Sequence, residues 1–271
     1  MALSPFQKSV VNLLAGNRSE TSYMAGGLVL NKDWPRQSDD LDIFHDTDEE
    51  IGASADVDIR TLREAGYRVT IDIDIYGIVE ATVSGASGST IVQWMSETRT
   101  RFFPLVRDLE WGARLHTADL AVNKMLAAST RTKARDYVDL VTISDRLCPL
   151  GPLVIAASGK PPHFSPQRIV DEIRRRGLSV SDDEFQSVKG LPQDFQAGNL
   201  REELIEALDA AEEYLQIVPT SVVGLLAVNN DGIPIEVRSL DEDGYLLRKA
   251  TDEHEVIPTL PDVPSSWSHE P

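Results

Sequence analysis

Cysteine, histidine and long apolar runs are scarce in this chain of 271 residues. The single cysteine, Cys148, excludes an internal disulfide and a zinc site built from cysteines. With only five scattered histidines in the chain, we interpret Cys148 as a structural thiol. No apolar run reaches the roughly 18 residues of a membrane helix, and the N-terminus is typical of an amphipathic helix rather than a signal peptide. We therefore expect a cytoplasmic protein without membrane contact.

Basic residues are also in the minority, with 26 against 44 acidic residues and a formal net charge of −18. From Asp182 onwards there are 20 acidic and 5 basic residues, so this stretch carries −15 and the rest of the chain only −3. Between Ser96 and Asp136, eight basic residues face five acids and alternate with aromatic residues. That segment fits either a local basic surface near a nucleic acid or ordinary balanced surface charge.

A strand-like segment carries the first candidate site. Asp40 and Asp42 alternate with Leu41 and Ile43, and because side chains on a strand alternate between faces, both acids should point the same way. Two carboxylates in one small space repel each other unless a cation lies between them. Hard divalent ions such as Mg²⁺ take carboxylate oxygens together with substrate phosphates. The pattern therefore predicts a metal site at Asp40 and Asp42, although a solvated face is the simpler alternative.

A glycine pair precedes that strand. Gly26 and Gly27 offer backbone N–H groups with no side chain in the way, followed by residues that can open a short helix. Twelve residues separate Gly27 from Asp40, and Arg36 and Ser38 lie in between. This arrangement resembles the Gly-Gly, spacer, Asp-x-Asp signature of the nucleotidyltransferase superfamily, and in finer detail the AbiEii-type nucleotidyltransferases. The resemblance implies that Gly26, Gly27, Arg36 and Ser38 contact a nucleotide.

A second segment supports this resemblance. Lys124 lies within a helical pattern, and the run from Lys133 through Arg135, Asp136 and Asp139 resembles the second block of the same family. The resemblance implies that Lys124 and Asp136 belong to the active site, and it extends to Arg135 and Asp139. From the residues alone, Lys124 could equally reach solvent, and the acids could form an ion-pair network that docks a helix.

The sequence departs from the superfamily where a third carboxylate is expected on a neighbouring strand. Gln93 occupies that position, and an amide does not neutralise a cation. Glu80, Asp72 and Asp74 are possible substitutes, although Asp72 and Asp74 more simply form a solvated face that alternates with isoleucines. One Mg²⁺ carried by the nucleotide is thus as plausible as two.

The order of elements predicts an α/β (α+β) nucleotidyltransferase fold, with a mixed sheet flanked by helices. We expect a nucleotidyltransferase domain at 1–148, a C-terminal region of helices and a β-hairpin at 149–251, and a flexible acidic tail at 252–271. The predicted helices are 4–16, 22–31 after a turn, 49–65, 117–129, 133–146, 166–176 and 200–215. The predicted strands are 40–45, 67–75, 78–84 and 89–95, with a hairpin formed by 222–228 and 233–237.

The resemblance implies transfer of NMP from an NTP to an acceptor hydroxyl with Mg²⁺. The family includes toxins of type IV toxin–antitoxin systems, so the tRNA 3′ end is a candidate acceptor and a separate antitoxin a candidate partner. Two alternatives stay open: a nucleotidyltransferase that modifies a protein or small-molecule hydroxyl, and a catalytically silent module whose acidic region binds a basic partner. The sequence does not mark which NTP is used.

Overall fold

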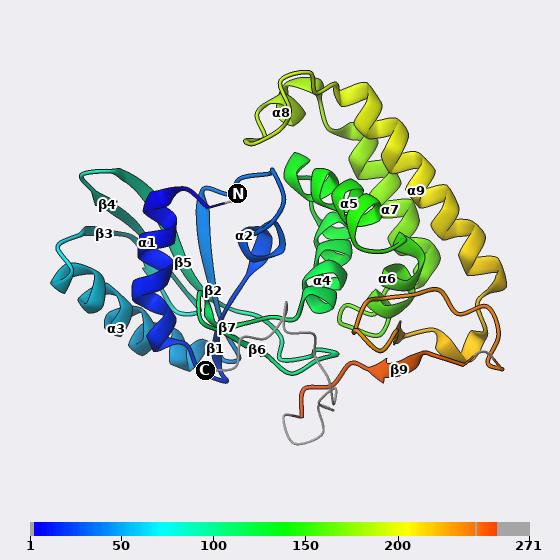
Figure 1. Cartoon of the computed structure of the whole chain (residues 1–271), viewed down its shortest axis with the longest axis horizontal. Helices are drawn as coiled ribbons and strands as arrows, with labels where there is room; N and C mark the ends of the chain where they lie inside the picture. The colour runs from blue at the N-terminus through cyan, green and yellow to red at the C-terminus, as the bar shows by residue number, and fades with distance from the viewer. Residues whose placement is uncertain (1–2, 242, 254–271) are drawn as a thin grey trace. The chain divides into compact units, whose positions relative to one another are not determined.

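The computed structural model describes residues 3–241 and 243–253. Two compact units divide these residues (Figure 1): the first holds 3–99 and 104–116, and the second holds 100–103 and 117–253 without residue 242. The domain boundary expected at residue 148 rests on a change in sequence pattern, and it stays a prediction.

The first unit is built on a seven-stranded sheet. Its strands lie side by side in the order β3-β4-β5-β2-β1-β7-β6. The pairs β2–β5 and β1–β7 are parallel and the other pairs are antiparallel, so the sheet is mixed, as predicted. The strands are β1 (Ser22–Ala25), β2 (Asp40–His45), β3 (Arg68–Ile75), β4 (Ile78–Gly85), β5 (Gly88–Ser96), β6 (Val106–Asp108) and β7 (Gly112–Arg114).

Two helices, α1 (Pro5–Leu14) and α3 (Ile51–Glu64), pack against β5 and against β3 to β5 respectively. The start of α1 is fixed by a capping box, in which the hydroxyl of Ser4 accepts from the backbone of Gln7 and the Gln7 side chain accepts from the backbone of Ser4. On the sheet side, Trp94 is fully buried and donates from Nε1 to Asp58 of α3 at 2.7 Å. Apolar side chains of the central strands fill the sheet face that α1 and α3 cover. The polar side chains of the same strands therefore lie on the opposite face.

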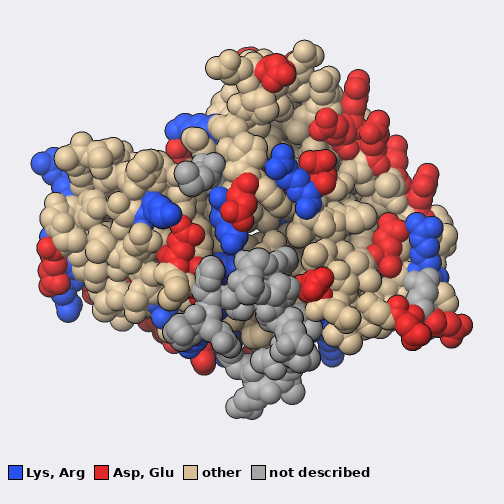
Figure 2. Space-filling view, viewed as in Figure 1, with Lys and Arg blue, Asp and Glu red and all other residues tan. Residues whose placement is uncertain are grey.

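The second unit is mainly helical. In the described part of the chain, α4 packs on α6 and α7, and α9 packs on α6 and α7. The polar face of α9 is acidic, and Figure 2 shows red side chains gathered along it. The helices are α4 (Thr117–Thr130), α5 (Ala134–Arg146), α6 (Leu150–Ala157), α7 (Pro166–Ser179), α8 (Asp182–Gln186) and α9 (Ala197–Ile217).

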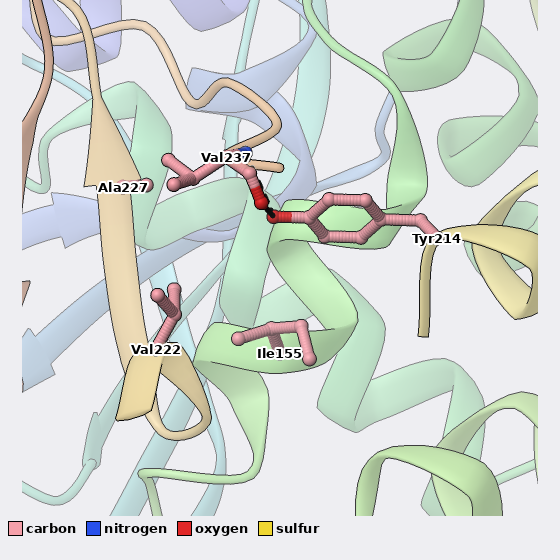
Figure 3. Close-up of a cluster of buried hydrophobic side chains, with 5 residues drawn as sticks. All are labelled: Ile155, Tyr214, Val222, Ala227 and Val237. Carbon is pink, nitrogen blue, oxygen red and sulfur yellow. Dashed lines mark hydrogen bonds between the residues drawn. The ribbon is translucent and has the colours of Figure 1, made fainter. Parts of the chain in front are cut away.

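The predicted C-terminal hairpin is wrong in its second strand. Strand β8 (Leu225–Val228) pairs with β9 (Leu246–Lys249), whereas the expected partner 233–237 forms an isolated bridge at Pro234 and a backbone hydrogen bond from Ile235 to Ala227 at 3.0 Å, without forming a strand. The turn formed by 229–232 exists, but it leads into an irregular segment. That segment is anchored by Tyr214 of α9, whose hydroxyl accepts from the Val237 N–H at 2.9 Å inside a small apolar cluster (Figure 3).

Several short elements lack a periodic signal in the sequence. The strands β1, β6 and β7 have four or three residues each. In the predicted turn and helix at 22–31, the helix is present as α2 (Gly26–Leu30), and β1 stands where the turn was expected. Within residues 3–241 and 243–253, each helix is too short or too polar to span a bilayer. The expected flexibility of 252–271 falls almost entirely outside the described residues.

Candidate functional site

The two aspartates of β2 lie on one face of the first unit's sheet. Along β2, Asp40 and Asp42 are partly exposed, whereas Leu41 and Ile43 are fully buried. The buried pair belongs to the face covered by α1 and α3, so both carboxylates lie on the opposite face. Because Asp40 and Asp42 are two residues apart on one strand, their side chains point in the same direction, as the sequence pattern predicts.

The glycine pair allows two side chains to approach the backbone very closely. Gly26 has φ +75°, and a Cβ there would overlap the carboxylate of Asp42. A Cβ on Gly27 would overlap the guanidinium of Arg36. Any larger residue at either position would push these charged groups away. The glycines therefore shape the site from within, by letting a carboxylate and a guanidinium lie against the start of α2.

Arg36 and Ser38 are both buried in the loop between α2 and β2. Arg36 donates from one terminal nitrogen to the carbonyl of Gln37 at 3.0 Å. The carbonyl of Ser38 accepts from the side-chain amide of Gln7 at 2.7 Å, which ties the loop to α1. Both residues thus lie in a loop with fixed backbone, and their nucleotide-binding roles stay predictions.

Gln93 stands beside Asp42 at the position of the expected third acid. The two residues are in register on the parallel strands β5 and β2, and Glu80 on β4 is in register with Gln93. Gln93 donates from Nε2 to Glu80 Oε2 at 2.5 Å. Among the described residues, no group of three or more His, Cys, Asp or Glu side chains could hold a metal by itself. A divalent cation here would rely on Asp40 and Asp42 together with substrate oxygens, which suits Mg²⁺.

Asp72, one of the candidate substitutes for the third acid, lies in β3 at a bulge between Ile71 and Ile73. The carboxylate of Asp72, the extra residue, accepts a hydrogen bond from Thr82 Oγ1 at 2.6 Å. Thr82 on β4 is in register with Ile91 on β5, and Ile91 is in register with Asp40 on β2. Asp72 therefore reaches the same face as the β2 aspartates. Asp72 and Asp74 are exposed, in agreement with the predicted solvated face, and the isoleucines between and beside them, Ile71, Ile73 and Ile75, are exposed as well.

Lys124, Asp136 and Asp139 form a buried cluster in the second unit. The ammonium of Lys124, on α4, lies 2.9 Å from Asp136 Oδ1 and 2.9 Å from Asp139 Oδ2, both on α5. The side chains of both aspartates are completely buried. Lys124 therefore does not extend freely into solvent, and the i, i+3 spacing of the two acids holds it between them.

Arg131 completes this cluster, although the sequence pattern did not single it out. It donates to both carboxylate oxygens of Asp136, at 2.8 and 3.1 Å. Burial by itself raises the pKa of Asp136, but the charges of Lys124 and Arg131 outweigh it and lower the pKa to about 2. The only sequence signal that could have indicated Arg131 was its position as a basic residue five positions before Asp136, in the turn between α4 and α5.

Arg135 is partly buried in the first turn of α5.

The predicted site residues thus occur as two groups. Gly26, Gly27, Arg36, Ser38, Asp40, Asp42 and Gln93 belong to the first unit, and Lys124, Arg135, Asp136 and Asp139 belong to the second. Each group has its own internal contacts. Their assignment to a single chemical function rests on the family resemblance, and it stays a prediction.

Comparison with known proteins identifies the fold. No family model matches the sequence, and no curated protein matches it. Among solved structures, the chain is similar to MenT4, a nucleotidyltransferase toxin from Mycobacterium tuberculosis H37Rv, with a TM-score of 0.56 and 16% identity over 77% of this chain and 82% of that one. A protein from H. pylori assigned as a nucleotidyltransferase matches with a TM-score of 0.49 and 15% identity, over 79% and 98%. The likeness to MenT4 confirms the predicted nucleotidyltransferase fold.

Proposed function

We propose that the protein is a metal-dependent nucleotidyltransferase that moves NMP from an NTP to an acceptor hydroxyl. The observation that carries this proposal is the pair Asp40 and Asp42 on one sheet face, with the backbone of Gly26 against the Asp42 carboxylate. Two carboxylates match the way proteins hold Mg²⁺, since substrate phosphates and water complete its coordination. The nucleotidyltransferase fold is consistent with this chemistry.

In this reaction the acceptor oxygen attacks the α-phosphorus in line, and the bond to pyrophosphate breaks. Mg²⁺ would supply positive charge for the phosphate oxygens. Asp40 and Asp42 would provide its protein ligands, and by the family resemblance Lys124 would neutralise further charge on the triphosphate. No covalent enzyme intermediate is needed, because positioning and charge stabilisation are the main contributions.

The contacts of Lys124 support a positioning role for its partners. Asp136 and Asp139 hold the ammonium from two sides at 2.9 Å, and Arg131 offsets the second negative charge. The cluster of two acids and two bases is therefore neutral overall. We propose that Asp136 and Asp139 fix the position of the Lys124 ammonium, and that Asp136 also helps to orient the acceptor.

For the acceptor, we propose the 3′ end of tRNA and a role as a growth-inhibiting toxin in the cytoplasm, neutralised by a separate antitoxin. The support is the family resemblance together with the likeness to MenT4, which is itself a nucleotidyltransferase toxin. Because the protein carries a net charge of −18, it would need a local basic surface to bind the negatively charged phosphates of an RNA acceptor. A protein or small-molecule hydroxyl is the alternative acceptor.

The test is incubation with α-labelled NTPs and Mg²⁺, in the presence of total RNA or of protein extract. We expect label in RNA with the wild type and at least about a 100-fold loss with Asp42→Asn, because the substitution removes a metal ligand. Asp56→Asn is the matched control, since it removes an exposed acid of α3 on the opposite face of the sheet while leaving Asp40 and Asp42 in place. Thermal unfolding without ligands should be similar for all three proteins.

Other outcomes discriminate the alternatives. Label that appears only in protein would replace the RNA acceptor with a protein hydroxyl. If Mg²⁺ and NTPs neither bind nor raise the melting temperature of the wild type, the protein is a silent binding module. The acidic face of α9 would then be the surface to test against basic partners.

A further inference from the structure

Three polar side chains form a row across the first unit's sheet. Asp42 on β2, Gln93 on β5 and Glu80 on β4 are in register on adjacent strands. Residues in register on neighbouring strands point to the same face, and their side chains lie about 5 Å apart at Cβ. Gln93 is therefore the immediate neighbour of both carboxylates, with Asp42 on one side and Glu80 on the other.

Glu80 determines which end of the Gln93 amide points towards it. An ionised carboxylate can only accept hydrogen bonds, so it selects the amide nitrogen as its partner. The contact observed is this one, from Gln93 Nε2 to Glu80 Oε2 at 2.5 Å. Because the nitrogen is held by Glu80, the oxygen of the same amide is turned away from β4, and β2 with Asp42 lies on that side.

A carboxylate at position 93 would not fit this row equally well. It would stand between Asp42 and Glu80, and three like charges on adjacent strands repel one another. An amide removes the repulsion and still offers an oxygen. Gln93 therefore stands where the third acid was expected, and the negative charge is carried instead by Glu80, one strand further from Asp42.

We propose that Glu80 is a positioning residue, which holds the Gln93 amide so that its Oε1 serves as a neutral oxygen donor beside Asp42. This inference rests on the proposed function, in which Asp40 and Asp42 hold Mg²⁺ together with an NTP. Glu80 acts through Gln93 and makes no contact with the substrate itself. Partners of this kind orient metal ligands and change metal affinity by about 10- to 100-fold.

The experiment measures the Mg²⁺ concentration that gives half of the maximal increase in the melting temperature of the protein, at a saturating concentration of a non-hydrolysable ATP analogue. Glu80→Ala should raise this concentration about tenfold, and Gln93→Ala should raise it by a similar factor. The double variant should be no worse than Gln93→Ala, because Glu80 acts only through the amide. Glu80→Gln should fall between the wild type and Glu80→Ala, since its amide oxygen can still accept from Gln93.

Asp56→Ala is the matched control, because it removes an exposed acid from α3, which covers the opposite face of the sheet. It should leave the Mg²⁺ requirement unchanged. Additive effects in the double variant, or a Glu80→Ala protein with the wild-type requirement, would overturn the inference while the proposed function stands. If the wild type shows no Mg²⁺-dependent stabilisation, the proposed function fails and the inference fails with it.

Discussion

At the scale of single residues, the first unit's site depends on the absence of a side chain. Gly26 combines a left-handed backbone conformation with direct contact to the Asp42 carboxylate. The sequence predicted that these glycines would leave room for phosphate. The structure shows that the room above Gly26 and Gly27 is taken by Asp42 and Arg36, so the glycines first serve the protein's own charged groups.

This contact leads to a prediction about Gly26→Ala. The added Cβ is strained at φ +75° and must displace Asp42, so we expect a loss of about 2–4 kcal/mol in unfolding free energy. Gly52→Ala is the matched control, because Gly52 lies in α3 with open space around its Cβ position. It should be neutral or stabilising by up to about 1 kcal/mol. Chemical denaturation measures both, and equal stability of the two variants would contradict the prediction.

The sequence revealed these residues to different degrees. Asp40 and Asp42 were predictable in position because strand alternation is a local property of the backbone. The partners of Lys124 were only partly predictable, since a helical pattern does not show which side chain on a second helix will face it. Arg131 lies in a turn, where no periodicity marks its direction, and only the packed structure reveals its bidentate contact with Asp136.

At the scale of secondary-structure elements, long periodic segments were predicted well. The helices expected at 117–129 and 133–146 are α4 and α5 within one residue at either end, and the strands β3 to β5 are similarly close. Short strands such as β6 and β7 were missed, because three residues carry no measurable period. The hairpin partner of β8 was misplaced, because 17 residues separate β8 from β9 and no local turn connects them.

The irregular segment between β8 and β9 depends on one buried hydroxyl. Tyr214 accepts from the backbone N–H of Val237 at 2.9 Å and lies 3.3 Å from its carbonyl oxygen. Tyr214→Phe would leave both buried backbone groups without this partner, so we expect a loss of about 1–3 kcal/mol. Tyr245→Phe is the control, since the Tyr245 hydroxyl is exposed and its contact with the Leu240 carbonyl is long, at 3.5 Å.

Thermal unfolding gives the size of both effects, and hydrogen exchange gives their location. Tyr214→Phe should increase exchange in peptides that cover β8 and residues 233–238, with little change in the first unit. A Tyr214→Phe protein as stable as Tyr245→Phe would show that this anchor contributes nothing.

At the scale of the whole molecule, acid should weaken the two units at different pH. Burial, followed by the charge of Arg18, lowers the pKa of His45 in the first unit to about 4. The unfolded chain protonates this histidine near pH 6.5, so stability is full above that pH and falls as the pH drops from 6.5 to 4. The shift corresponds to about 3 kcal/mol.

The second unit should resist mild acid for longer. The pKa of Asp136 is lowered to about 2, so its contribution is kept above the unfolded value near 3.8 and is lost only as the pH falls from there towards 2. Burial raises the pKa of Asp119, which favours the folded state as the pH falls. At pH 5, hydrogen exchange should therefore increase in β2 and β5 before it increases in α4 and α5.

His45→Gln is the control for this order, because it removes the titrating ring from the first unit. Its stability should change less than that of the wild type between pH 6.5 and 5. Earlier loss of protection in α4 and α5 would contradict the assignment of the two pH ranges to His45 and Asp136.

The bulge in β3 has a consequence for the solubility of the protein. Among the described strands β3 is an outer strand of the sheet, and it exposes Ile71, Ile73 and Ile75. A straight, apolar outer strand can recruit strands from other molecules and start aggregation. The additional residue at Asp72 interrupts the regular spacing of backbone donors and acceptors and adds a charge. The same irregularity that brings Asp72 to the site face therefore makes β3 a poor template for intermolecular sheets.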